Sequence, residues 1–189
     1  YGYNRPTSPC IDSIAAEGMR FNNHYCGSSP CMPSRAAWSS GRFGVRNGVV
    51  SNHGPGGEFH IERGAYGGPK PDNDMFPRQL RKHDYNAYSF TTFADRHSAH
   101  WFMTGWTEFH TPNLKCGGDD ASEVNAKVLP WLKNNAAQED YFMHVHYWNA
   151  HRCYYIDEEW SERFKNYPVT QDWPSEETIA AHQSIDGPF

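Results

Sequence analysis

A cysteine and an arginine four residues apart are the first candidates for chemistry in this sequence. Cys31 and Arg35 lie in residues 28–42, SSPCMPSRAAWSSGR. If a helix begins near Pro33, Arg35 lies one turn further along the same side as Cys31. The N-terminus of such a helix presents unpaired N–H groups and the positive end of the helix dipole. A guanidinium is a planar, permanent cation suited to a tetrahedral oxyanion. The residues therefore indicate a nucleophile beside an anion-binding site.

Cys31 has three other readings: half of a disulfide, a zinc ligand, or a small buried apolar side chain. The five cysteines are an odd number and form no C-x-x-C pair: Cys10, Cys26, Cys31, Cys116 and Cys153. Disulfide frameworks favour even numbers in smaller chains, and structural zinc sites favour paired ligands at short spacing. The pattern favours the nucleophile, with a zinc module as a weaker alternative.

The surroundings of Cys31 resemble the signature of a known family. C-x-P-S-R followed by AAWSSGR is similar to the signature of the sulfatases, in which the cysteine is converted after translation to formylglycine. Further on, HVHYWNAHRCYY is similar to the family's W-D-P-H-x-P-Y segment, and this places His151 on the histidine that contacts the sulfate and the leaving group. The resemblance covers residues 5–155. The positions that match the signature are Cys31, Pro33, Ser34, Arg35, Gly41 and Arg42.

The resemblance implies hydrolysis of a sulfated carbohydrate or an aryl sulfate. In the family, the formylglycine aldehyde hydrates to a geminal diol, one hydroxyl attacks sulfur, and deprotonation of the other expels the covalent sulfate. Cys31 would be the precursor, Arg35 would hold the diol and its negative charge, and His151 would bind sulfate or protonate the leaving oxygen. The implied partners are a sulfate-ester small molecule or sulfated glycan and a formylglycine-generating maturation enzyme.

Two alternatives stay open beside this reading. One is hydrolysis of phosphonate or phosphate esters by the same modified residue. The other is a sulfatase-like fragment that binds anions or glycans without turnover. By resemblance, the compartment would be periplasmic, secreted or lysosome-like.

The sequence departs from the family pattern at a lysine and at the metal ligands. Where family members show G-Y-x-T-x-x-x-G-K-x-H, this chain reads HDYNAYSFTTFADRHSAHWF, with no lysine in register. We therefore expect Arg96 to bind substrate and His97 to be catalytic. The family holds one calcium ion, and Cys31, as formylglycine, is the only ligand that can be named; the others are expected outside this chain. Asp119 and Asp120 follow two glycines and are interpreted as a helix N-cap.

Helices alternating with isolated strands must position these residues. Such alternation is typical of an α/β fold with a mostly parallel central sheet flanked by helices. The resemblance implies the same alkaline-phosphatase-like fold, incomplete at both ends. Ligands of such sheets bind in the loops after the strands, where Cys31, His97 and His151 fall. The patterns predict helices over residues 9–17, 33–40, 75–83, 120–134 and 158–165, and strands over residues 19–25, 85–93 and 141–148.

Chain length, net charge and the distribution of apolar residues limit the domain organisation and the classes of partner. The 189 residues predict a single partial catalytic domain over residues 1–189, with a long Gly- and Pro-rich loop at about residues 47–74. The net charge of −5 is not gathered into a basic stripe, which argues against nucleic acid as a partner. No apolar run approaches the roughly 18 to 20 residues of a membrane span. We find no signal-peptide pattern, and because the chain starts at Tyr1 we expect an interior piece of a longer protein.

Overall fold

The computed structural model describes residues 5–59, 75–138, 140–149, 151, 157–168 and 175–183. The chain divides into two compact units, Phe21–Tyr155 on the one hand and Tyr1–Arg20 with Ile156–Phe189 on the other. The smaller unit contains α1 (Pro9–Glu17), α7 (Glu158–Glu162) and α8 (Glu176–Gln183). Within it, the Arg5 guanidinium donates to the carbonyl oxygen of Pro168 at 2.8 Å. A single domain over residues 1–189 stays a prediction.

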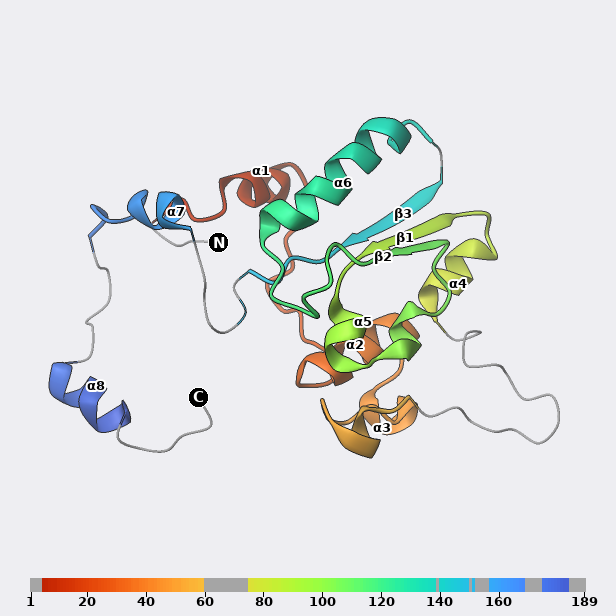
Figure 1. The fold of residues 1–189 in the computed structure, drawn as a ribbon, viewed down its shortest axis with the longest axis horizontal. Helices are drawn as coiled ribbons and strands as arrows, with labels where there is room; N and C mark the ends of the chain where they lie inside the picture. The colour runs from red at the N-terminus through yellow and green to blue at the C-terminus, as the bar shows by residue number, and fades with distance from the viewer. Residues whose placement is uncertain are drawn as a thin grey trace. The chain divides into compact units, whose positions relative to one another are not determined.

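The larger unit is built on a three-stranded, all-parallel sheet in the order β2-β1-β3 (Figure 1). This confirms the predicted α/β class with a parallel sheet. In the register, Tyr88 of the central strand lies opposite Glu108 on one side and Met143 on the other. The elements are α2 (Cys31–Ser40), α3 (Gly44–Asn47), η1 (Gly54–Gly57), α4 (Phe76–Arg81), β1 (Asn86–Phe90), α5 (Phe93–His97), η3 (His100–Met103), β2 (Glu108–His110), α6 (Ala121–Asn135) and β3 (Tyr141–Val145).

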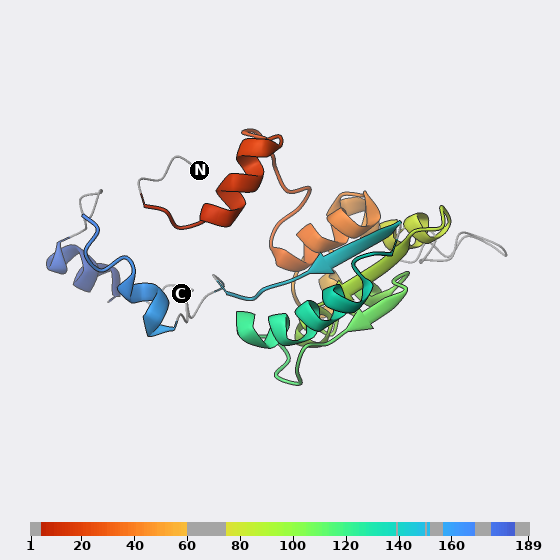
Figure 2. The same cartoon turned by 90° about the horizontal axis from the view of Figure 1, so that it is seen from above.

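Side chains of β1 alternate between the two faces of the sheet, as the period of a strand requires. Tyr88 and Phe90 pack against Val124 and Val128 of α6. Ala87 belongs to a separate cluster on the other face, where α2 lies (Figures 1 and 2). The sheet is therefore covered by helices on both faces, and α2, which carries Cys31, is fixed to one of them.

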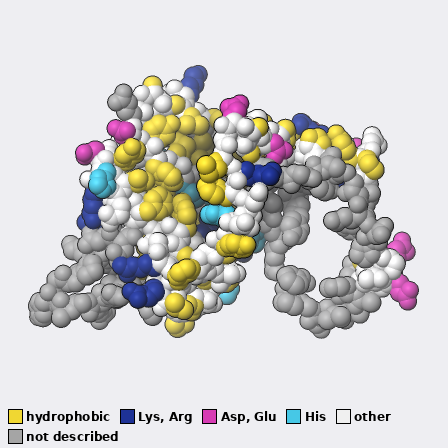
Figure 3. Space-filling model, turned by 180° about the vertical axis from the view of Figure 1, so that it is seen from behind, with side chains coloured by type: hydrophobic (Ala, Val, Ile, Leu, Met, Phe, Trp, Pro, Cys, Tyr) yellow, Lys and Arg dark blue, Asp and Glu magenta, His cyan; other side chains and the backbone are white. Residues whose placement is uncertain are grey.

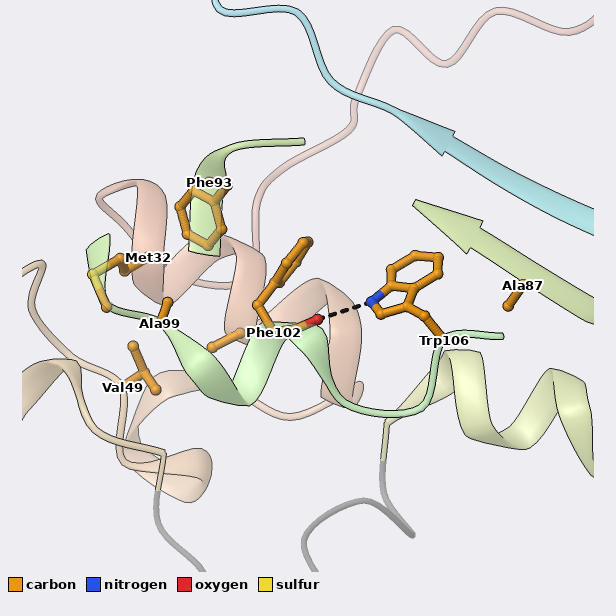
Figure 4. Packing of buried hydrophobic residues seen from close by; sticks show 8 residues of the cluster. Met32, Val49, Ala87, Phe93, Ala99, Phe102 and Trp106 are labelled. Carbon is orange, nitrogen blue, oxygen red and sulfur yellow. Dashed lines mark hydrogen bonds between the residues drawn. The ribbon is translucent and has the colours of Figure 1, made fainter. Parts of the chain in front are cut away.

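The cluster on the α2 face is the larger of the two and is rich in aromatic side chains (Figure 4). Met32 from α2, Phe93 from α5 and Phe102 from η3 are each at most 2% exposed. The Trp106 indole N–H donates to the carbonyl oxygen of Phe102 at 2.8 Å. Burial of each large side chain contributes about 1.5–3 kcal/mol. This packing holds the starts of α2 and α5 close to one another.

One predicted strand is absent from the described residues, and one observed strand was not predicted. The strand expected over residues 19–25 is wrong: these residues form no strand, and Met19, Phe21 and Tyr25 are largely exposed. A strand is stabilised by backbone pairing with a neighbour, and in the described part of the chain no strand pairs with this segment. The short edge strand β2 was not anticipated from its sequence.

The long loop predicted at about residues 47–74 is described only in part. Its first residues contain the single turn η1, and residues 60–74 lie outside the described residues. No helix among the described residues combines the length and apolar character needed to cross a membrane.

Candidate active site

Cys31 is the first residue of α2 and is half-buried. The helix begins there because Ala36 and Ala37 favour helix and because Pro33 lies in the first turn, where no backbone N–H partner is needed. It ends at Gly41, whose left-handed conformation (φ 68°) lets its N–H donate to Ala37 at 2.8 Å. The predicted helix and its glycine cap are confirmed. They place a sulfur atom at the N-terminus of a ten-residue helix.

The Asn52 side chain bridges the thiol and the first turn of α2. Its Nδ2 donates to the Cys31 sulfur at 3.2 Å, and its Oδ1 accepts from the Met32 N–H at 3.0 Å. One amide group thus satisfies an N–H at the helix end and orients the sulfur. Asn52 lies just before η1, in the segment predicted as a loop, where no pattern singled it out.

Arg35 lies one turn along α2, as its spacing predicts. Its NH2 group is 2.8 Å from His146 Nε2, and its guanidinium carbon lies 4.5 Å from the centre of the Phe93 ring. Burial lowers the pKa of Arg35 from its usual value, and the nearby Cys31 opposes this shift. Arginine stays protonated in proteins, so a fixed positive charge lies beside the sulfur.

His97 ends α5 and brings its imidazole to the same place. Its Nε2 lies 4.0 Å from the Cys31 sulfur. Burial lowers the pKa of His97, and the positive charges of Arg96 and Arg35 lower it further. Near neutral pH the ring is therefore uncharged, and it can accept a proton from a group at position 31.

A cavity of about 260 Å³ joins residues that lie far apart in the sequence. Cys31, Arg35, His97 and His151 line it, with Trp148 in its wall. His151 follows β3, its N–H donates to the Trp148 carbonyl at 2.8 Å, and the two rings are 5.4 Å apart. The four residues predicted to be catalytic thus meet in one cavity, although the sequence spreads them over more than a hundred positions.

Arg96 does not line this cavity. It is exposed on α5, and the stem of its side chain packs against Gly117, where an added Cβ would lie 3.0 Å from its Cδ. Its role in binding substrate stays a prediction.

Two half-buried histidines, His144 in β3 and His146 directly after it, face α2. His144 bonds to the Ser89 hydroxyl at 3.0 Å, and its ring lies 5.2 Å from that of Trp38 in α2. Burial, and then the charge of Arg35, lower the pKa of His144 to about 4 and that of His146 to about 3. Both rings are therefore neutral. Their alternation in the sequence, HVH, places them on one face, but it does not reveal that one of them bonds to Arg35.

The Asp119–Asp120 pair divides into two different roles. Asp120 is the N-cap of α6, and its N–H donates to the Glu123 carboxylate at 3.0 Å, which confirms the N-cap interpretation for that residue. Asp119 is 2% exposed and accepts a hydrogen bond from the Thr92 hydroxyl, which in turn accepts from the Trp148 indole N–H at 2.6 Å. This chain of hydrogen bonds anchors the wall of the cavity.

The described residues do not form a calcium site. No group of three or more His, Cys, Asp or Glu side chains among them is arranged to hold a metal ion. Calcium prefers carboxylate and carbonyl oxygens, whereas Cys31 is surrounded by Asn52, Arg35 and His97. The metal role predicted for Cys31, as formylglycine, stays a prediction.

Comparison with known proteins decides the family. The sulfatase family model matches residues 1–186. The chain belongs to the sulfatase family. Its parallel α/β sheet is consistent with the fold of that family.

The similar sulfatases are much longer than this chain. Arylsulfatase H of Homo sapiens is 36% identical over 85 residues, which are 45% of this chain and 15% of that protein. Steryl-sulfatase of Rattus norvegicus is 36% identical over 85 residues, 45% of this chain and 14% of that protein. N-acetylgalactosamine-6-sulfatase of Rattus norvegicus is 29% identical over 120 residues, 64% of this chain and 21% of that protein. The chain thus matches about a fifth or less of each. No solved structure matches it at a significant level.

A second, wider cavity of about 600 Å³ also reaches Cys31 and Arg35. Trp38, Phe43 and Tyr25 line it, and each of them is more than 40% exposed. Figure 3 shows hydrophobic side chains gathered on one face of the molecule, with histidine side chains among them. In this sulfatase chain, Cys31 and Arg35 thus lie where a small histidine-lined cavity meets a larger aromatic one.

Proposed function

We propose that the protein hydrolyses sulfate esters with a formylglycine made from Cys31. The observation that carries this proposal is the single cavity shared by Cys31, Arg35, His97 and His151 at the N-terminus of α2. The positive end of the α2 dipole and a fixed guanidinium are both suited to a sulfate anion. The family membership of the chain supports the same class of reaction.

Formylglycine would supply a hydrated aldehyde, whose one hydroxyl attacks sulfur and whose other hydroxyl later releases the sulfate. Arg35 would bind the anionic oxygens throughout, since its charge does not depend on pH. His97, held neutral 4.0 Å from the Cys31 sulfur, would accept the proton of the hydroxyl at position 31. His151, which is exposed at the edge of the cavity, would donate the proton that the leaving oxygen needs.

Calcium would be held by the formylglycine made from Cys31 together with ligands outside the described residues. The residues described around Cys31 offer nitrogen donors and a cation, which do not suit calcium. The roles proposed above for binding and proton transfer would all fall to residues of this chain.

The proposed substrates are sulfated carbohydrates or aryl sulfates. Aromatic side chains of the wider cavity pack equally well against sugar and aryl rings. The names of the relatives include both an N-acetylgalactosamine-6-sulfatase and a steryl-sulfatase. Either substrate class fits the Trp38 and Phe43 rings.

Mass spectrometry of the full-length protein, made in a host with the maturation enzyme, tests the nucleophile directly. We expect the peptide that contains Cys31 to have the lower mass of the aldehyde. Turnover of an aryl sulfate should exceed that of the matching aryl phosphonate, and Cys31→Ala should abolish it. Cys10→Ala, a change of an exposed cysteine in the other unit, is the matched control. If Cys31 is unmodified and the protein is inactive, the result would favour a sulfatase-like protein that binds anions without turnover. If the aryl phosphonate is turned over faster, it would favour a phosphonate or phosphate ester hydrolase.

A further inference from the structure

His146 is a half-buried histidine to which the proposed reaction assigns no part. It directly follows β3, and its N–H donates to the carbonyl oxygen of Phe90 in β1 at 3.0 Å, so its backbone continues the sheet. Both nitrogens of its ring have partners. Nε2 lies 2.8 Å from the Arg35 NH2 group, and Nδ1 lies 2.9 Å from the Thr91 hydroxyl.

Donor and acceptor chemistry determines which nitrogen carries the proton. A guanidinium has five N–H donors and no acceptor, so His146 Nε2 must accept from Arg35. The ring proton is then on Nδ1 and donates to the Thr91 oxygen, which also accepts the Phe93 N–H at 3.0 Å. Thr91 is fully buried, so no water competes for that oxygen. The low pKa of His146, about 3, agrees with a ring that stays neutral.

We propose that His146 is a positioning residue that orients the Arg35 guanidinium toward Cys31, with its acceptor nitrogen fixed by Thr91. The expected effect of His146 on turnover rests on the proposed function. Arg35 has a long side chain with many rotamers, and the Phe93 ring, 4.5 Å from the guanidinium carbon, holds only the plane of the group. The hydrogen bond to His146 fixes its rotation in that plane. It uses one donor and leaves the others for an anion at position 31.

The conservative variant distinguishes this role from packing. His146→Gln retains an acceptor at the position of Nε2, whereas His146→Leu fills the space without one. Since a misplacement of about 1 Å lowers rates about 100-fold, we expect His146→Leu to lower kcat/KM for an aryl sulfate by about that factor. His146→Gln should recover most of the loss. Thr91→Val, which removes the partner of Nδ1, should lower kcat/KM less than His146→Leu does.

A second readout does not depend on sulfatase activity. In the unmodified full-length protein, a fixed Arg35 should make Cys31 react faster with the anion iodoacetate, relative to neutral iodoacetamide, than an exposed cysteine does. His146→Leu should reduce this ratio and His146→Gln should preserve it. Ser89→Ala is the matched control, because it removes the buried hydrogen bond of the neighbouring His144 without touching Arg35. Nitrogen-15 NMR should show the His146 proton on Nδ1.

The measurements distinguish failure of the positioning role of His146 from failure of the proposed function. If His146→Leu and His146→Gln alter the iodoacetate ratio equally, or if Ser89→Ala alters it as much, His146 acts only in packing and the inference is overturned. A proton on Nε2 would overturn it as well. If the protein shows no sulfatase activity but the ratio and the NMR signal are as expected, the proposed function fails and the positioning role stands.

Discussion

Removal of the Thr92 hydroxyl tests the chain of hydrogen bonds behind the cavity wall. Thr92→Val preserves the shape of the side chain, but it leaves the Trp148 N–H and the Asp119 carboxylate without their shared partner. Thr92 is 0% exposed, Asp119 2% and Trp148 9%, so water cannot easily replace the lost hydroxyl. A buried polar group without a partner costs about 1–3 kcal/mol. Two such groups predict a loss of about 2–6 kcal/mol in the free energy of unfolding.

The assay is urea unfolding of the full-length protein, followed by circular dichroism. Thr111→Val is the matched control: its hydroxyl donates to the exposed Asp95, where water can replace it, so we expect a change within about 0.5 kcal/mol. A loss for Thr92→Val no larger than that of Thr111→Val would refute the reasoning. Such a result would mean that the Thr92 hydroxyl makes no net contribution to the fold.

Two further predictions concern pH and the end of α2. The unfolded state takes up a proton on His144 near pH 6.5, but the folded state does so only near its lowered pKa of about 4, so stability should fall as the pH drops through this window. The full shift corresponds to about 3 kcal/mol at pH 4. His146, with its pKa of about 3, contributes in the same window, so His144→Gln should reduce the slope of unfolding free energy against pH by roughly half, and an unchanged slope would contradict the assignment. Gly41→Ala should lower the unfolding free energy by about 1–2 kcal/mol, because φ is 68° and an added Cβ would meet nothing within 4 Å, so only backbone strain is introduced. Gly41→Asn, whose side chain tolerates the left-handed conformation, should cost less than Gly41→Ala in the same urea unfolding assay, and an equal loss would contradict the strain argument.

Most helices and two of the three strands could be predicted because their patterns are local. Ser8 with Pro9, and Asp120 with Glu123, mark helix starts, and Gly41 marks a helix end. A proline inside a helix usually kinks or breaks it, but α6 continues through Pro130. Pro130 is exposed, so water can bond the backbone carbonyl that a proline leaves without a donor. The strand predicted at residues 19–25 was wrong because a strand, unlike a helix, depends on a pairing partner elsewhere in the chain.

The sequence by itself determined the nucleophile candidate, the arginine one turn away and the family, since all three follow from spacing within a dozen residues. Only the tertiary structure decided which side chains complete the site. Asn52 reaches the Cys31 sulfur, and His146 reaches Arg35 from 111 positions away. These contacts arise because a parallel sheet brings the ends of β1 and β3 side by side, and α2 packs on one face of the sheet. No local pattern encodes which of two alternating histidines will meet the arginine there.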